Sequence, residues 1–478
     1  MERARPGLVG RLAVGRPLLI GVVFALGLTT LAMAGLTRPY VGPHPEILAR
    51  FAIAALLIIA APALAAAGAP RGGRARILLL AAFVAAIVGL HFTGRHYLDP
   101  QAAYPLLDLS ALVAALALAT WLVALRPAIG GNLRLAAAAP YVAILAVFAA
   151  LGHVALQNGL TETGLAPAVA AALGLSLGLS MTVAVDVAAG FADLFVKGAD
   201  RARAAAGAAH QAIAPATFAV LCAGSAFLAQ YFFPAAHEVG LMTVWIAFAA
   251  ATLGCGAALF VVSGSLALIV VNEKTAVNEN RRRSDIRRVW RPMRRMLPAT
   301  SAYAATGLVV IGAVLAVFEA ERSLTPAVAV FIGGAAAASL LTFVSLRTTI
   351  LIVSLVTFSH LLATLLYTLT GAPAPDAGQS LPALALAAVA FAQFGLAWRD
   401  NAHPRLNARE VAEAAVIQAA GRIFPTLGFG AAAFLVAALS GLWSDGAVAS
   451  GHFAVTTGLG LVIAPALITA MSARYGYY

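Results

Sequence analysis

Hydrophobic runs of about 20 residues recur along the whole chain, and they constrain its fold more than any other feature. A run of this length crosses a bilayer core of about 30 Å as a helix, which satisfies its own backbone hydrogen bonds. We count about fourteen runs, near residues 17–37, 47–68, 76–93, 106–125, 136–157, 165–195, 211–233, 239–271, 299–318, 325–345, 348–371, 381–398, 423–441 and 453–473. The chain is therefore predicted to form an all-α, polytopic membrane bundle.

The charges of the chain predict its orientation. The net charge is +12, which could indicate nucleic-acid binding, but only 10% of the residues are charged and 62% are hydrophobic. With a cytoplasmic N-terminus, all of the 31 Lys and Arg except Arg38, Arg50, Arg95 and Arg322 fall on the cytoplasmic side. Because the positive-inside rule predicts this asymmetry, we expect both termini in the cytoplasm of a bacterium, a location in its inner membrane, and lipids as partners. We expect no nucleic-acid partner.

The first hydrophobic run could belong to a secretory signal peptide. Ala32-Met33-Ala34 resembles a cleavage site, but the run before it is longer than the 7–15 residues of a signal peptide's apolar region. We therefore expect a retained span.

Motifs for enzymatic chemistry do not occur in the sequence. It contains no Walker A, H-E-x-x-H or paired C-x-x-C pattern, and Cys222 and Cys255 both fall inside predicted spans. We therefore expect no catalytic, cofactor or metal site, and no enzyme activity.

A basic segment, "VNEKTAVNENRRRSDIRRVWRPMRRMLP", divides the chain into two transmembrane parts. Each part closes with a similar block, in which a Pro at the cytoplasmic start of a span (Pro215 or Pro425) precedes an apolar helix, a short outer loop and a last helix. The two blocks run in the same direction, which is typical of a parallel repeat. We predict an N-terminal hairpin, a first six-helix repeat, a basic cytoplasmic linker helix and a second six-helix repeat, at residues 1–70, 71–272, 273–298 and 299–478.

Asp186 lies near the middle of an apolar run, within "GLSMTVAVDVAAGFADLF". A charge at the bilayer centre costs about 2.5–3.5 kcal/mol on insertion scales, so such residues usually face the bundle interior and have a function. Gly178, Thr182, Asp186, Gly190 and Asp193 share one helical face, whose small residues would admit a neighbouring helix. Asp186 is either a group that loads and releases a proton or a structural residue bonded to another helix.

Two further polar residues, Gln393 and His360, fall inside predicted spans and join the candidate substrate or helix-packing face. A lone His or Gln in a span more often makes a hydrogen bond that packs two helices together. Asp193 is close enough to Lys197 to be solvated at the membrane surface.

The two blocks resemble the last three helices of a half of a resistance-nodulation-division (RND) protein, with the MMPL branch as the nearest match. The resemblance covers residues 165–272 and 381–473 and rests on an Asp-bearing span, a basic helix, a Pro-led span, a short outer loop and a final span ending near "PALI". It implies two parallel six-helix units, the use of a proton gradient and the export of hydrophobic compounds or lipids. In that family the fourth helix carries the acidic proton-relay residue, and Asp186 is the matching residue.

The sequence departs from this family at two points. The gaps that would hold folded extracytoplasmic domains are only "TGRHYLDPQAAYPL" and "EAERSLTP", so a porter domain is missing. The second half carries Gln393 where the relay residue would lie, so a relay would be asymmetric and rest on the first half.

Three functions stay open at this point. The first is a proton-coupled transporter or flippase for a hydrophobic or lipid-like substrate. The second is a scaffold subunit of an envelope complex, with envelope-protein partners or as a homo-oligomer. The third is an integral-membrane transferase that uses the outer loop around His96, Asp99 and Asp108.

Overall fold

The computed structural model describes residues 166–234, 239–268, 324–402, 408–439, 443 and 445–475. They form α8 (Ala166–Val196), α9 (Arg201–Phe232), α10 (Leu241–Ala257), the π-helix η1 (Ala258–Val262), α11 (Ser263–Leu268), α14 (Pro326–Phe343), α15 (Leu346–Thr370), α16 (Ala377–Asn401), α17 (Ala408–Leu439) and α18 (Gly446–Tyr475). The predicted N-terminal hairpin, the basic linker helix and the outer loop with His96, Asp99 and Asp108 lie outside the described residues. The predicted domain boundaries stay predictions.

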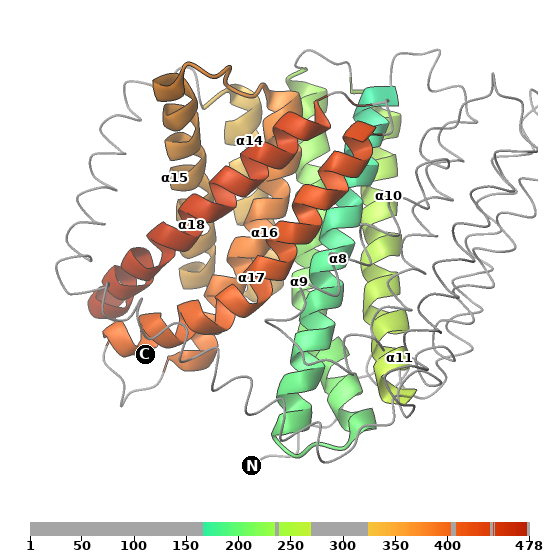
Figure 1. Ribbon diagram of the computed structural model, residues 1–478, viewed down its shortest axis with the longest axis vertical. Coiled ribbons are helices and arrows are strands. Elements are labelled where there is room, and N and C mark those ends of the chain that lie inside the picture. The colour runs from blue at the N-terminus through green and yellow to red at the C-terminus, as the bar shows by residue number, and fades with distance from the viewer. Residues whose placement is uncertain are drawn as a thin grey trace, which may run out of the picture.

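The described helices form a membrane bundle and confirm the predicted fold class. Seven of the described helices are long and apolar enough to cross a membrane. In addition, α17 covers the predicted run 423–441 as far as Leu439. Most of the helices run along the long axis of the molecule, whereas α17 and α18 cross it obliquely, and α8 and α16 both begin at the upper end in Figure 1. These seven spans agree closely with the runs predicted from hydrophobicity alone.

Polar residues at the chain turns fix where the helices begin. The Asp200 carboxylate accepts a hydrogen bond from the backbone N–H of Arg203 at 2.9 Å at the start of α9. Asp376 and Gln379 form a capping box at the start of α16, in which each side chain bonds the backbone of the other residue. Gly371 ends α15 with φ +69°, a conformation that suits glycine. These local signals set the helix ends, while packing holds the bundle together.

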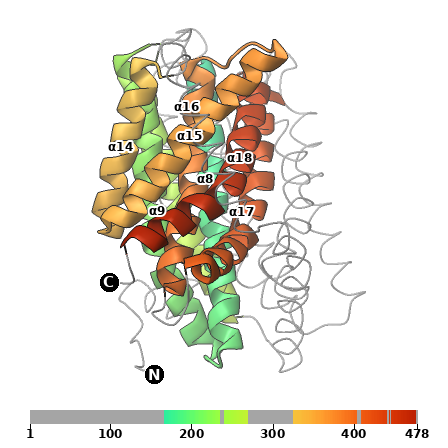
Figure 2. The ribbon, with the colours of Figure 1, turned by 90° about the vertical axis from the view of Figure 1, so that its left-hand side faces the viewer.

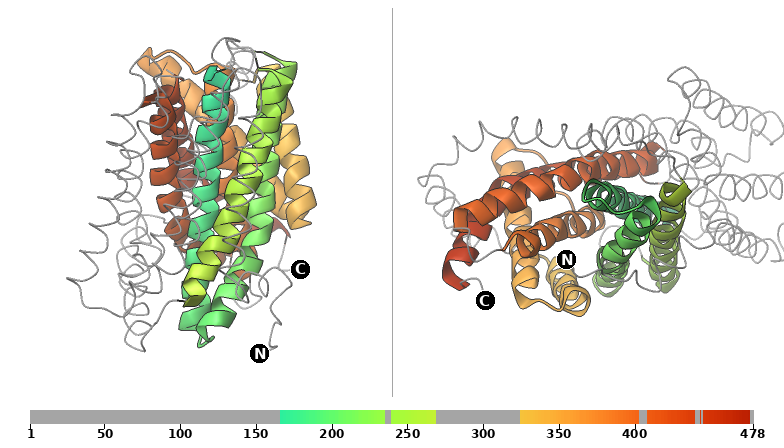
Figure 3. Two further views of the ribbon diagram at one scale, coloured as in Figure 1. Left: turned by 90° about the vertical axis from the view of Figure 1, so that its right-hand side faces the viewer. Right: turned by 90° about the horizontal axis from the view of Figure 1, so that it is seen from below.

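Two helices, α8 and α16, form the centre of the bundle. The most apolar stretch of α8 is completely buried and that of α16 is 94% buried, against 39% to 56% for the other five candidate spans. A helix that is apolar on every face is expected to be surrounded by other helices. Viewed from below, α8, α9 and α10 form one group beside α16, α15 packs against α16, and α14 lies against α9 and α15 (Figures 2 and 3).

The groups α8–α9–α10 and α16–α17–α18 each pack as a triplet of mutually contacting helices. In each triplet a buried span is followed by a long helix with an internal proline, Pro215 in α9 and Pro425 in α17, and then by a last span. The predicted cytoplasmic helix before each proline is the first part of that same long helix. The second triplet contacts the first mainly through α16 and α17 against α8 and α9.

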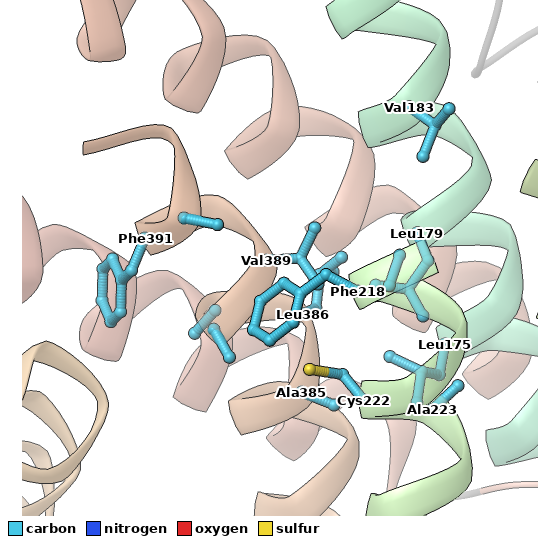
Figure 4. Close-up of a cluster of buried hydrophobic side chains, with 14 of the residues drawn as sticks. Leu175, Leu179, Val183, Phe218, Cys222, Ala223, Ala385, Leu386, Val389 and Phe391 are labelled. Atoms are coloured by element: carbon cyan, nitrogen blue, oxygen red, sulfur yellow. The ribbon is translucent and has the colours of Figure 1, made fainter. Parts of the chain in front are cut away.

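Small and large side chains interlock between the two triplets. Leu175 and Leu179 of α8, Phe218 and Cys222 of α9, and Leu386 of α16 meet in one buried cluster (Figure 4).

Glycines let the central helices approach each other closely. A Cβ atom on Gly178 would lie 3.0 Å from Leu386, and one on Gly430 would lie 2.3 Å from Leu386 and 2.5 Å from Phe453. Glycine is therefore required at Gly430 because larger residues would overlap with both neighbours.

Basic residues gather at one end of the described bundle. Lys197, Arg201, Arg203, Arg347, Arg399 and Arg409 all lie at the helix ends that point downward in Figure 1. Asp376, which caps α16, and Asp445, in the turn before α18, lie at the opposite end. This arrangement agrees with the orientation that the positive-inside rule predicts, in which the basic end faces the cytoplasm.

We expect this orientation to be measurable by cysteine labelling. Lys197→Cys, at the basic end, should react with a membrane-impermeant maleimide only after the membrane is opened, whereas Ala372→Cys should react in intact cells. Both residues are exposed, and the native Cys222 and Cys255 are buried and serve as unreactive background. The reverse pattern would show that the basic end faces outward.

Gly430→Ala should destabilise the bundle by about 1–3 kcal/mol, because the added methyl group overlaps with Leu386 and Phe453. Gly451→Ala on α18 is the matched control, since a Cβ there meets no atom within 4 Å. The free energy of unfolding can be measured in mixed detergent micelles. Equal effects of the two variants would contradict the close approach at Gly430.

Candidate functional site

Asp186 lies in the buried centre of α8, and its partner comes from the other triplet. Its side chain is 3% exposed, and Oδ2 accepts a hydrogen bond of 2.7 Å from Nε2 of Gln393 on α16. Gln393 is itself buried. A buried carboxylate is costly unless other groups bond to it, so this contact stabilises the approach of α8 to α16. The contact joins the two residues that the sequence placed at matching points of the two halves.

Arg422 of α17 completes the site. Its Nη1 donates to Oε1 of Gln393 at 3.2 Å and lies 3.9 Å from Oδ1 of Asp186. The side chain of Arg422 is 17% exposed, so most of the guanidinium is removed from solvent. Oδ1 of Asp186 makes no hydrogen bond within the described part of the chain. Amide, carboxylate and guanidinium thus meet where α8, α16 and α17 come together.

Asp193, two turns further along α8, approaches the same guanidinium from the other side. Its Oδ2 lies 3.6 Å from Nη2 of Arg422, and its side chain is 32% exposed. The sequence predicted Asp193 to be solvated near Lys197, and its partial exposure agrees with this. Its contact with Arg422 was not predicted.

The charges of these three groups do not cancel. With Asp186, Asp193 and Arg422 all ionised, their sum is −1, and uptake of one proton makes it zero. A charge in a water-poor environment is expensive, so the buried carboxylate of Asp186 favours a proton or a neighbouring cation. The buried carboxylate of Asp186 has an oxygen that is free to take a proton, because Gln393 occupies only Oδ2.

The carboxylate comes from the first half of the chain, but both of its partners come from the second. The sequence predicted a relay that rests on the first half and placed Arg422 among the cytoplasmic charges that set topology. The structure instead brings Gln393 and Arg422 to Asp186. The sequence does contain a signal that Arg422 has a partner inside the bundle, because it is the single Arg of the largely apolar segment "AAGRIFPTLGFG".

The predicted face of α8 touches two different neighbours. Gly178 faces Leu386 of α16, as a partner-helix site should, but Gly190 lies against Ala208 and Gln211 of α9. The hydroxyl of Thr182 donates to the carbonyl oxygen of Gly178 within α8 itself.

His360 lies in a separate cluster within the second half. Its Nδ1 is 3.2 Å from Nε2 of His452 on α18, both side chains are buried, and the ring of Tyr367 stacks at a tilt near His452. The pair joins α15 to α18, in keeping with a hydrogen bond that packs helices. The described residues contain no group of three or more His, Cys, Asp or Glu that could hold a metal ion.

Two solved structures of SecDF resemble this chain in fold. A crystal structure of SecDF in its super-membrane-facing form matches with a TM-score of 0.50 and 14% identity, over 77% of this chain and 62% of that one. A second SecDF structure, described as a translocon-associated membrane protein from Thermus thermophilus, matches with a TM-score of 0.47 and 13% identity over 77% and 63%. No family model and no curated protein matches the sequence.

The first of these likenesses shows that the chain shares a membrane fold with SecDF. The chain spans about three fifths of the length of the structures it matches. The finer resemblance to the MMPL branch stays a prediction.

Gln393→Leu should reduce stability by about 1–3 kcal/mol, because Asp186 loses the hydrogen bond to Oδ2. In an Asp186→Asn background, Gln393→Leu should cost at most half as much stability as it does in the unchanged protein. The reason is that an uncharged amide without a partner costs less to bury than a carboxylate. Gln230→Leu is the control, because Gln230 is buried but its Nε2 has no hydrogen-bond partner among the described residues. Additive losses in the double variant, measured by unfolding in detergent, would contradict this contact.

Proposed function

We propose that this chain is a proton-coupled membrane transporter of the RND type in which Asp186 loads and releases the proton. The observation that carries the proposal is the buried Asp186–Gln393–Arg422 cluster, at which the two halves of the bundle meet. A carboxylate held at such a junction links its protonation to the way the two halves pack. The RND-like fold supports the same function.

The proposed substrate is hydrophobic or lipid-like, and an MMPL-like activity is the closest description. The two gaps that would hold porter domains are short in the sequence, so the bilayer itself is the expected source of substrate. Large apolar side chains such as Trp245, Leu341 and Val462 are exposed on the described bundle, as expected for surfaces that meet lipid. The substrate would pass between leaflets or out of the inner membrane of a bacterium.

A lipid-flipping assay tests this function. The protein is reconstituted into liposomes that contain a fluorescent phospholipid, a pH gradient is imposed, and movement of the probe between leaflets is followed by chemical quenching. We expect a flipping rate that depends on the gradient and that Asp186→Asn reduces at least about tenfold, a barrier change of about 1.4 kcal/mol. Loss of the proton-binding group removes the coupling while the amide still packs against Gln393.

Asp200→Asn is the control, because this exposed carboxylate caps α9 and Asn can replace it as a cap. If flipping were equal in Asp186→Asn and the unchanged protein, Asp186 would be a structural residue and the scaffold function would be favoured. Infrared difference spectra should also show the Asp186 carboxyl changing protonation between about pH 5 and 8.

A further inference from the structure

Two buried histidines meet between α15 and α18 in the outer half of the bundle, the half opposite the basic end. His360 lies ten residues before the end of α15, and His452 lies six residues after the start of α18. Nδ1 of His360 is 3.2 Å from Nε2 of His452, and the two ring planes are nearly perpendicular, at 89°. Both side chains are buried, and the transport cycle proposed above uses neither of them.

The distance between the two rings shows that they share one hydrogen. Nitrogen atoms of two imidazoles form a hydrogen bond when one carries a hydrogen and the other offers a lone pair. This bond joins α15 to α18, two helices that pack against each other. The neutral pair of histidines therefore holds the outer half of α15 against α18.

The surroundings of His452 indicate which nitrogen is available for a further proton. Its Nδ1 is buried and has no hydrogen-bond partner among the described residues. Buried N–H groups without an acceptor are rare because they are costly, so we assign the hydrogen of neutral His452 to Nε2, which donates to Nδ1 of His360. Nδ1 of His452 then keeps its lone pair and is the basic atom of the pair.

The described residues around the pair supply little charge to balance a bound proton. In the halves nearer the outer end, α14, α16 and α17 carry no titratable side chain, and α15 carries only Tyr367 besides His360. The described carboxylates at this end are Asp376, whose side chain caps α16, and Asp445, which precedes α18. Asp445 lies seven residues before His452, about 10 Å away along the helix axis. A proton on the pair would therefore leave a buried charge without a close counter-charge among these residues.

Tyr367 links the pair to the outer surface. It lies seven residues after His360 on α15, in the last turn and a half of the helix, and its side chain is partly exposed. The centroid of its ring is 5.9 Å from that of His452, and the two planes are tilted by 33°. An aromatic ring within about 6 Å stabilises a neighbouring cation. Tyr367 is thus placed to connect His452 with the outer solvent and to favour its protonated form.

We propose that His452, with its partner His360, is a second proton-binding site, and that a proton bound there separates α15 from α18 at the outer end. An N–H bond forms at Nδ1 of His452 with a proton from the outer solvent, and the pair then carries one positive charge. Burying that charge is expensive, and water that enters between the helices lowers the cost. Because the proton binds more strongly in the separated, hydrated state, a lower pH favours that state.

This inference goes beyond the proposed function, since it requires neither Asp186 nor a transported substrate. The experiment measures the distance between α15 and α18 in the full-length protein in liposomes. Spin labels are attached at Leu369→Cys and Val448→Cys, which replace exposed residues near the outer ends of the two helices, while the native cysteines are buried. We expect the mean distance between the labels to increase by at least about 2 Å when the pH falls from about 8 to about 5.

Two substitutions of histidine by glutamine separate this site from other titrating groups. His452→Gln keeps an amide N–H that can donate to His360 but binds no proton, so the distance should no longer depend on pH. His210→Gln is the matched control, because His210 is exposed on α9, and it should retain the full change. Imidazole nitrogen NMR spectra should show a histidine resonance that titrates over the same pH range and is absent in His452→Gln.

Three results would overturn the proposal. If the resonance that His452→Gln removes does not titrate, the pair binds no proton in this range. If it titrates while the label distance stays constant, the proton does not separate the helices. If the distance changes equally in His452→Gln, other groups cause the separation. None of these results bears on the flipping assay of Asp186, and size-exclusion profiles at both pH values show that folding is retained.

Discussion

The hydrogen bond between Asp186 and Gln393 is the contact on which the arrangement of the two halves depends. It lies between α8 and α16, the two helices that are buried along nearly their whole length. These helices also meet at apolar contacts such as Gly178 against Leu386, which fix the distance but discriminate poorly between registers. A single buried carboxylate accepts only a position of α16 that brings a donor to it, so it specifies how far one half slides along the other.

The same contact makes the site responsive to charge. Gln393 donates a hydrogen bond to Asp186 and accepts one from Arg422, so one uncharged amide links the carboxylate to the guanidinium. A second carboxylate at this position would add another negative charge to a group that already carries one in excess. An amide keeps both hydrogen bonds without that cost. The departure from the RND pattern at Gln393 therefore has a physical reason in this chain.

Hydrophobicity alone predicted the helical class and the position of the described spans, because a membrane requires each span to be long, apolar and internally bonded. Asp186 was found for the same reason, since a carboxylate stands out in an apolar run. Gln393 was also identified, but as a lone polar residue with no known partner. Which helices surround a span cannot be deduced from its own periodicity, and Gly190 shows this, because it faces α9 and not the second half.

Arg422 was missed for a different reason. The rule that assigns basic residues to the cytoplasm treats Arg422 in the same way as Arg399 and Arg409 at the helix ends. It does not identify a basic residue that points into the bundle from inside α17, a helix of 32 residues. The sequence does not mark where along such a helix the membrane begins. His452 was missed similarly, because it lies one residue before the predicted span 453–473.

The two halves supply different polar groups to the site, and this difference sets how many protons the site can bind. The first half supplies two carboxylates on one helix, and the second supplies an amide and a guanidinium on two helices. Among the described residues, one guanidinium lies near both carboxylates, and a proton on Asp186 leaves Arg422 and Asp193 as a balanced pair. A buried site avoids a net charge, so in the proposed cycle it binds and releases one proton at a time.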